Sequence, residues 1–235
     1  MITYPINWKQ IGIKITLIDI EKQLIQIIKE LNCNCLALSG GVDSSLMLYF
    51  MTKIFRKNIK TFTIALNEKH PDYIYSNIAI NYFKVKGEIY TPRKIPKRLK
   101  NDCSGDEIVR MFYNNLKLKK IKKIIACDGI DEFTGGYYEH MKYPNEKTYY
   151  KFIRKLQKKQ LEPLNRNSND IEVLLPYIDS NLILLLSQIP LSEKVDKFQR
   201  KKIIYNIAKD KIPLEILERR KYGFCDAMII KENKS

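Results

Sequence analysis

The chain contains one stretch whose residue types and order could bind phosphate: Ser-Gly-Gly-Val-Asp-Ser-Ser at residues 39–45. An apolar run at 35–38 precedes it and a helix-like run at 46–51 follows it. Glycines let a backbone turn sharply and come close to an anion, and the start of a helix offers free N–H groups. Ser44 and Ser45 add hydroxyl donors. This order predicts a phosphate-binding loop between a buried strand and a helix.

Asp43 is the unusual residue of this loop, because a carboxylate beside a phosphate repels it unless a cation lies between them. The pattern therefore favours a nucleotide bound with Mg²⁺. A Gly-Gly pair alone would fit an ordinary turn, but the whole stretch after an apolar strand favours nucleotide binding. No Gly-x-x-x-x-Gly-Lys-Ser/Thr stretch occurs, which excludes the kinase and GTPase type of loop.

A second stretch with chemical potential, residues 128–137, reads Asp-Gly-Ile-Asp-Glu-Phe-Thr-Gly-Gly-Tyr and follows the apolar run 123–127. Its three carboxylates are unfavourable in one place unless they hold a cation or a reacting group. By itself the stretch fits a solvated acidic turn equally well. Ligands of parallel sheets bind beyond the carboxyl ends of the strands, so both stretches are expected at one edge.

The elements that must position these stretches alternate along the chain. Apolar periodicity predicts helices at 17–31, 44–56, 71–83 and 106–118, and strands at 35–38, 61–66, 88–91 and 123–127. This alternation predicts an α/β fold, a Rossmann-like parallel sheet with helices on both faces. Further helices are predicted at 149–158, 179–187, 197–209 and 214–219, with a polar loop at 165–170. We expect one domain over 1–235, with a nucleotide-binding core at 1–145 and a helical C-terminal part at 146–235.

Taken together, the two stretches resemble the synthetase domain of asparagine synthetase, a member of the ATP pyrophosphatase superfamily. The second motif of that family runs Gly-Glu-Gly-(Ser/Ala)-Asp-Glu-x-x-Gly-Gly-Tyr. Three further stretches are similar in the same order, at 61–66, 171–179 and 221–224. The resemblance implies an adenine nucleotide alpha hydrolase-like fold, cleavage of ATP between the α and β phosphates, and an adenylylated intermediate.

The resemblance also implies roles for single residues. Asp43 and Asp131 would hold Mg²⁺, and Lys221 would stabilise charge on the phosphates. Asp128 stands where the family has a glutamate tied to the acyl acceptor. The nucleotide site implied for ATP comprises Leu38, Ser39, Gly40, Gly41, Asp43, Ser44, Ser45, Ala65, Cys127 and Gly129.

Several residues depart from the family pattern, and they concern the step in which the activated acyl group is handed to its acceptor. Asp128 is one methylene shorter than glutamate, which moves an acid–base group by about 1 Å. Ala126 and Cys127 replace Ser-Gly, and Leu174 replaces an arginine. Ile2 stands where glutamine-hydrolysing members carry a nucleophilic cysteine, so the glutaminase half is expected to be absent. Nitrogen is then expected from free ammonia, from a separate glutaminase or from an amine on the substrate.

Three functions follow as hypotheses. The first is an ATP-dependent amide-forming ligase that adenylylates a small-molecule or peptide carboxylate, releases pyrophosphate, and lets ammonia or an amine displace AMP. The second is an RNA-modifying enzyme that adenylylates a tRNA base, motivated by the net charge of +16. The third is a non-catalytic nucleotide-binding partner, against which the retained Asp43, Asp131 and Lys221 argue.

Composition bounds the cellular setting. No apolar run reaches the ~18 residues of a membrane span, and the N-terminus lacks the features of a secretory signal. Five cysteines without Cys-x-x-Cys spacing argue against a disulfide framework and against a zinc site. A cytoplasmic protein is therefore expected. The basic residues are spread along the chain, so nucleic-acid binding and a mere compositional habit both remain open.

Overall fold

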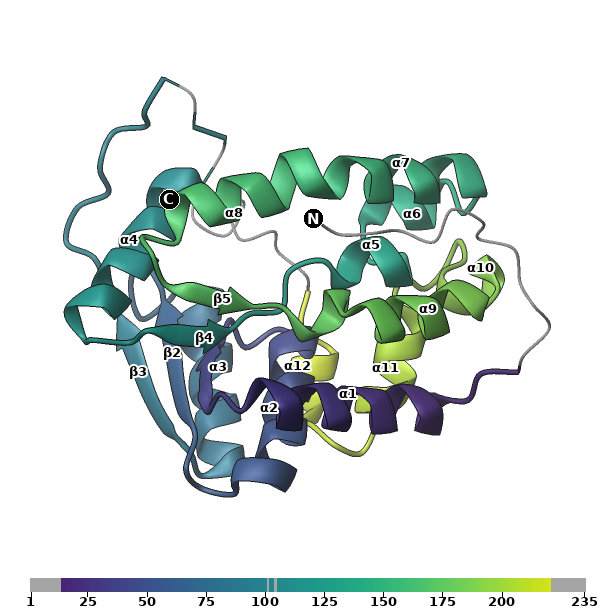
Figure 1. The fold of residues 1–235 in the computed structure, drawn as a ribbon, viewed down its shortest axis with the longest axis horizontal. Coiled ribbons are helices and arrows are strands. Elements are labelled where there is room, and N and C mark those ends of the chain that lie inside the picture. Colours follow the sequence, from purple (N-terminus) through teal and green to yellow (C-terminus); the bar gives the residue numbers. More distant parts are fainter. Residues whose placement is uncertain (1–13, 101, 104, 221–235) are drawn as a thin grey trace.

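The computed structural model describes residues 14–100, 102–103 and 105–220 (Figure 1). Its centre is a five-stranded parallel sheet with the strand order β3-β2-β1-β4-β5. The strands are β1 (Cys35–Ala37), β2 (Lys60–Ile64), β3 (Lys86–Tyr90), β4 (Lys123–Ile125) and β5 (Glu172–Leu174). The chain runs outward from β1 to β3 and then returns to β4 on the other side of β1. The strand order thus reverses between β1 and β4, which is where such sheets bind ligands.

Helices cover both faces of the sheet, as predicted. One face carries α1 (Leu17–Leu31), α2 (Val42–Phe55) and α3 (Pro71–Phe83), and the other carries α4 (Asp106–Leu118). Neighbouring residues of one strand enter different cores, because successive side chains point to opposite faces. Ile124 of β4 belongs to the α4 side, and Ile125 belongs to the α1 and α2 side.

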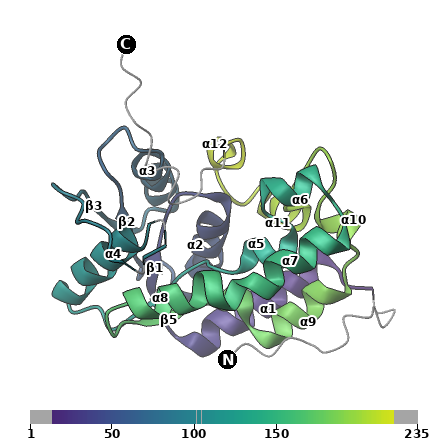
Figure 2. The same ribbon diagram turned by 90° about the horizontal axis from the view of Figure 1, so that it is seen from above.

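The C-terminal part is helical, as predicted. After β4 come α5 (Ile130–Thr134), α6 (Tyr138–Lys142), α7 (Glu146–Leu156), the π-helix η1 (Gln157–Leu161), α8 (Glu162–Asn167), the 3-10 helix η2 (Pro176–Ile178), α9 (Ser180–Gln188), α10 (Leu191–Lys194), α11 (Lys202–Ala208) and α12 (Leu214–Leu217). Figures 1 and 2 show α7, η1 and α8 as one long helix. Among the described residues, no helix is long and apolar enough to cross a membrane.

Two local predictions were wrong. The polar loop expected at 165–170 is helical up to Asn167, because Asn167 donates its side-chain amide to the Pro163 carbonyl and closes a turn. The helix expected at 197–209 begins only at Lys202. The Asp196 carboxylate accepts the backbone N–H groups of Phe198 and Gln199, at 2.8 and 2.7 Å, which competes with a helix there. The short strand β5 was not predicted.

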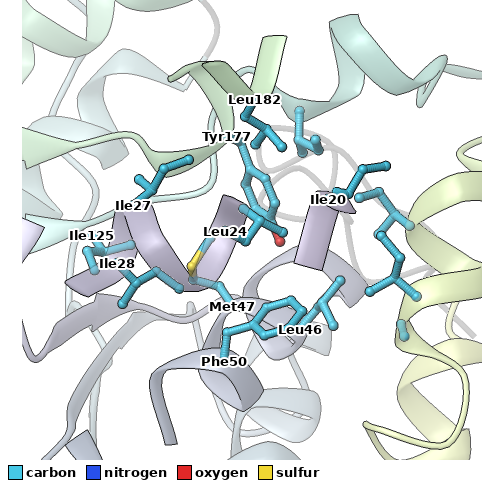
Figure 3. Packing of buried hydrophobic residues seen from close by; sticks show 14 of the residues in the cluster. Ile20, Leu24, Ile27, Ile28, Leu46, Met47, Phe50, Ile125, Tyr177 and Leu182 are labelled. Atoms are coloured by element: carbon cyan, nitrogen blue, oxygen red, sulfur yellow. The ribbon is translucent and has the colours of Figure 1, made fainter. Parts of the chain in front are cut away.

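One large hydrophobic cluster runs from Ile20 of α1 to Ile216 of α12 and so joins the sheet to the C-terminal helices. Apolar residues of α1 recur at helical spacing and pack against α2 and Tyr177 (Figure 3). Tyr177 is fully buried, and its hydroxyl donates to the Asp43 carbonyl oxygen at 3.0 Å. The core thereby reaches the first turn of α2.

Candidate active site

The predicted phosphate loop connects β1 to α2. Gly40 has a φ of +68°, and a Cβ atom there would overlap the backbone of Tyr75 and Ser76. Only glycine therefore fits this turn. The Ser39 and Ser44 hydroxyl oxygens lie 3.2 Å apart, and Ser44 also donates to the Gly41 carbonyl at 3.2 Å. The loop is internally braced, and its backbone leads into the free N–H groups of α2.

The second stretch connects β4 to α5 and lies at the same edge of the sheet, as expected. Gly129 directly precedes α5 and has a φ of +91°. Asp131 lies in the first turn of this helix, and its carbonyl accepts the Gly136 N–H at 2.7 Å. Gly129 before α5 and Gly135 after it, with a φ of +69°, turn the chain sharply on either side of this short helix. The carboxylates between them are thereby held in place.

Lys201 joins the two stretches. Its Nζ lies 2.6 Å from a carboxylate oxygen of Asp43 and 2.6 Å from one of Asp131, and its side chain is 1% exposed. Burial works to lower the pKa of Lys201, but the charges of Asp131 and Asp43 outweigh it and raise the pKa above the usual value. Lys201 is therefore a permanent cation, suited to stabilising negative charge and unsuited to taking protons.

A cleft of about 500 Å³ lies over the carboxyl ends of the strands. Most of the predicted site residues line it: Leu38, Ser39, Asp43, Ser44, Cys127, Asp128, Gly129 and Asp131. Gly41 lines a smaller adjoining pocket of about 120 Å³. The other predicted residues, Gly40, Ser45 and Ala65, are not among the lining residues of either cavity. Gly40 and Ala65 supply backbone to the loop and the strand end, and Ser45 is buried within α2.

The smaller pocket gathers cations that the sequence analysis did not select. Arg200, Lys201 and Arg219 line it together with Ser39, Gly41 and Asp43. Arg219 donates to the Ser39 carbonyl at 2.7 Å and forms an ion pair with Asp72 at the start of α3. The side chains of Arg219 and Asp72 are 7% and 5% exposed, so this pair is fixed by its surroundings.

The far end of the cleft holds a second polar group. Tyr137 donates its hydroxyl to Glu132 at 2.7 Å, and the Gln160 amide of η1 donates to the Tyr137 oxygen at 2.6 Å. Burial raises the pKa of Glu132 to about 7, against the hydrogen bond from Tyr137, which lowers it. Burial also raises the pKa of Asp128, and the charge of Asp131 adds to the rise. This end of the cleft suits proton transfer or binding of an amine.

Lys221, predicted to lie at the phosphates, falls outside the described residues. Among the described lysines, Lys201 contacts Asp43 of the phosphate loop and Asp131. In the sequence, Lys201 is one of three neighbouring basic residues, 200–202, and no local pattern distinguishes it from the other lysines. Its position depends on a contact across 158 residues, which no local pattern encodes.

Asp43 and Asp131 are suited to hold Mg²⁺. The second carboxylate oxygen of Asp43 is buried and has no hydrogen-bond partner among the described residues. Within that part of the chain, no group of three or more potential metal ligands occurs. Mg²⁺ commonly uses one or two carboxylates together with substrate phosphates. The residues present therefore fit an ion that arrives with the nucleotide.

The fold and the site define a parallel α/β domain with a nucleotide-phosphate loop and an adjoining carboxylate cleft. The model of the asparagine synthase family matches residues 33–171 and 165–233. The chain belongs to the asparagine synthase family, which marks it as an enzyme of the ATP pyrophosphatase class and implies that it uses ATP.

A probable glutamine-hydrolysing asparagine synthetase of Acanthamoeba polyphaga mimivirus is 28% identical over 221 residues, covering 83% of this chain and 40% of the relative. The chain thus spans 40% of the length of this relative. Among solved structures, the U34-tRNA thiolase NcsA from Methanococcus maripaludis matches with a TM-score of 0.46 at 13% identity, over 86% of this chain and 74% of that one. The NH3-dependent NAD synthetase from Campylobacter jejuni matches with a TM-score of 0.42 at 19% identity, over 74% of this chain and 92% of that one.

Proposed function

We propose that the protein is an ATP-dependent, AMP-forming ligase that makes amide bonds. The observation that supports it best is the placement of Lys201 between Asp43 and Asp131, at the end of the phosphate loop. This arrangement puts a permanent cation and two candidate metal ligands where a triphosphate would lie. The substrate is a carboxylate, either a small molecule or a peptide.

In the first half-reaction, a carboxylate oxygen attacks the α phosphorus of ATP and the bond to the β phosphate breaks. Acyl-adenylate and pyrophosphate are formed. The loop N–H groups and Ser39 hold the phosphates, and Lys201 together with Arg219 balances the charge that develops on the leaving pyrophosphate. Mg²⁺ on Asp43 and Asp131, when bound, neutralises further phosphate charge.

In the second half-reaction, ammonia or an amine attacks the acyl carbon and the bond to AMP breaks. One proton must leave the nitrogen, and Asp128 lies in the cleft where it could accept that proton. We propose free ammonia or a separate glutaminase as the nitrogen source.

The four described cysteines carry free thiols, which supports the cytoplasm as the site of action.

A pyrophosphate-release screen tests the proposal. Purified protein is given Mg-ATP and single amino acids, peptides or other carboxylates, with and without ammonium. We expect release that depends on one carboxylate and that is lost in Asp43→Asn, whereas the exposed control variant Asp210→Asn retains it. Pyrophosphate release that occurs only in an arm containing RNA, with no carboxylate added, would instead support base adenylylation. No substrate-dependent release in any arm would favour the non-catalytic partner.

A further inference from the structure

Two surface segments beside the cleft are rich in basic residues and free of acidic ones. Residues 91–100, which follow β3, read Thr-Pro-Arg-Lys-Ile-Pro-Lys-Arg-Leu-Lys. Residues 147–161, which form most of α7 and η1, contain six basic residues and no carboxylate. We give the name basic rim to eight of the exposed cations of these segments, Arg93, Lys94, Lys97, Lys100, Arg154, Lys155, Lys158 and Lys159. In the described chain, no member of the basic rim has an ion pair.

The second segment lines the cleft, and the first is tied to α4, a helix that lines it. Arg98 pairs with Glu107 of α4 at 3.1 Å, which ties the first segment down beside Cys103, a residue of the cleft lining. In the second segment the apolar face of α7 is buried, and the π-helix η1 places Lys159 and Gln160 on the cleft. Helices α4 and α8 are joined by the Arg110–Asn167 hydrogen bond of 2.6 Å. The basic rim is therefore a structured border of the cleft.

The interior of the cleft has the opposite charge. Among the described residues, Lys159 is the only basic residue that lines the cleft. The lining also contains six carboxylates, those of Asp43, Asp72, Asp106, Asp128, Asp131 and Glu132. A polyanion is attracted to the rim and repelled from the interior. Without a metal ion, a bound polyanion would thus run along the border and keep its phosphates outside the cleft.

We propose that the basic rim binds single-stranded RNA, with the phosphates on the rim and a base or a substituent facing the cleft. Lysines and arginines without partners are suited to neutralise phosphates. A protein partner fits less well, because protein interfaces bury aromatic and apolar anchors and are poor in lysine. Leu99 is the only large exposed hydrophobic side chain in the described parts of the two segments. Single strands are favoured over duplexes because their bases are free to turn toward a cleft.

Fluorescence anisotropy with a labelled RNA of about 20 nucleotides, at ~50 mM salt and without ATP, tests the proposal. The rim variant combines Lys94→Glu, Lys97→Glu, Lys155→Glu and Lys158→Glu. Its control combines Lys22→Glu, Lys29→Glu, Lys57→Glu and Lys209→Glu, exposed lysines on α1 or just after α2 and α11. Figure 1 shows α1 and α2 in the lower part of the molecule, on the side away from α7. Both variants change the net charge equally.

We expect the rim variant to lose at least about 100-fold in affinity and to have a flatter salt dependence, with the control within about 5-fold of the parent. The proposal would be overturned by equal losses of affinity in both variants or by no binding of the RNA to the parent. It would also be overturned if duplex DNA bound as tightly as the RNA. Polyglutamate displacing the RNA at equal charge concentration would overturn it too, in favour of an acidic protein. The inference rests on the proposed function only for the role of the cleft. Because binding is measured without ATP, its failure is distinct from a failure of ligase activity.

Discussion

At the residue scale, Lys201 shows how one contact can set the charge of a site. Its ammonium group balances two carboxylates that are each 20% exposed. Removal of one partner from a buried ionic group leaves uncompensated charge, which is more unfavourable than the intact pair is favourable. The effect of a Lys201 substitution on the free energy of unfolding should therefore depend on whether Asp131 still carries its charge.

Lys201→Met is expected to destabilise the protein by ~3 kcal/mol, because Asp43 and Asp131 then repel each other without a cation. The double variant Lys201→Met with Asp131→Asn should recover at least about half of that loss. Urea unfolding of the two variants and the parent measures both effects. Additive losses would show that the two residues are not coupled. Pyrophosphate release should fall by ~10²–10³-fold in both variants.

Arg219 acts on the phosphate loop through the Ser39 carbonyl and on α3 through Asp72. A guanidinium can reach both acceptors at once, whereas an ammonium group on a flexible chain cannot replace its planar geometry. Arg219→Lys should weaken ATP binding by about 10-fold and change the free energy of unfolding by less than ~1 kcal/mol. Calorimetric titration with a non-hydrolysable ATP analogue and urea unfolding provide the two readouts. An unchanged affinity would mean that Arg219 does not position the loop.

At the element scale, the turn between β1 and α2 depends on a backbone conformation that side chains exclude. Gly40→Ala should destabilise the protein by ~2 kcal/mol or more and abolish ATP binding, because its Cβ overlaps α3. Gly41→Ala is the matched control, since its Cβ would lie at an ordinary contact distance of 3.4 Å from the Ser39 hydroxyl oxygen, and its φ is −79°. Equal loss of stability in the two variants would contradict this account.

The packing of α10 depends on a buried lysine. Lys194 is 2% exposed, donates to the Tyr149 hydroxyl oxygen at 2.9 Å and has no carboxylate partner among the described residues. Tyr149 in turn donates to the Phe133 carbonyl of α5 at 2.9 Å. Burial lowers the pKa of Lys194 to about 7. The lysine therefore folds in its neutral form at alkaline pH and must carry an unfavourable charge below neutrality.

The sign of the resulting pH dependence follows from proton binding. Between pH 7 and the unfolded pKa of about 10.4, the unfolded chain holds a proton that the folded chain lacks, so stability rises with pH. The parent should therefore gain ~2 kcal/mol relative to Lys194→Met between pH 7 and pH 9. Urea unfolding at both pH values measures the difference. A constant difference between the two proteins would show that Lys194 remains charged.

At the scale of the whole molecule, ligand binding should stabilise the fold as one unit, because one core joins the sheet and the C-terminal helices. Mg-ATP at 100 times its Kd adds ~2.7 kcal/mol, which raises Tm by roughly 5–11 °C for a chain of this size. Asp43→Asn should reduce the shift, and the exposed control Asp210→Asn should not. Differential scanning fluorimetry with and without Mg²⁺ measures it. A shift that Asp43→Asn leaves unchanged would place the nucleotide elsewhere.

The parallel sheet and both chemical stretches could be predicted because their signals are local. An apolar run followed by Gly40-Gly41 marks the end of β1, and one followed by Asp128-Gly129 marks the end of β4. Strand order then brings Asp43 and Asp131 together. Lys201 and Arg219 could not be predicted in the same way, since each acts through a contact across more than 150 residues. The start of α11 was misplaced because side-chain hydrogen bonds at Asp196 override helical periodicity.

The distance along the chain between the phosphate loop and its cations has a consequence for protein synthesis. Lys201 follows Asp43 by 158 residues, and Arg219 follows Ser39 by 180. A nascent polypeptide therefore displays the loop and its carboxylates well before the cations that neutralise them have been translated. The nucleotide site is completed late in translation, after the sheet that carries its loop has been made.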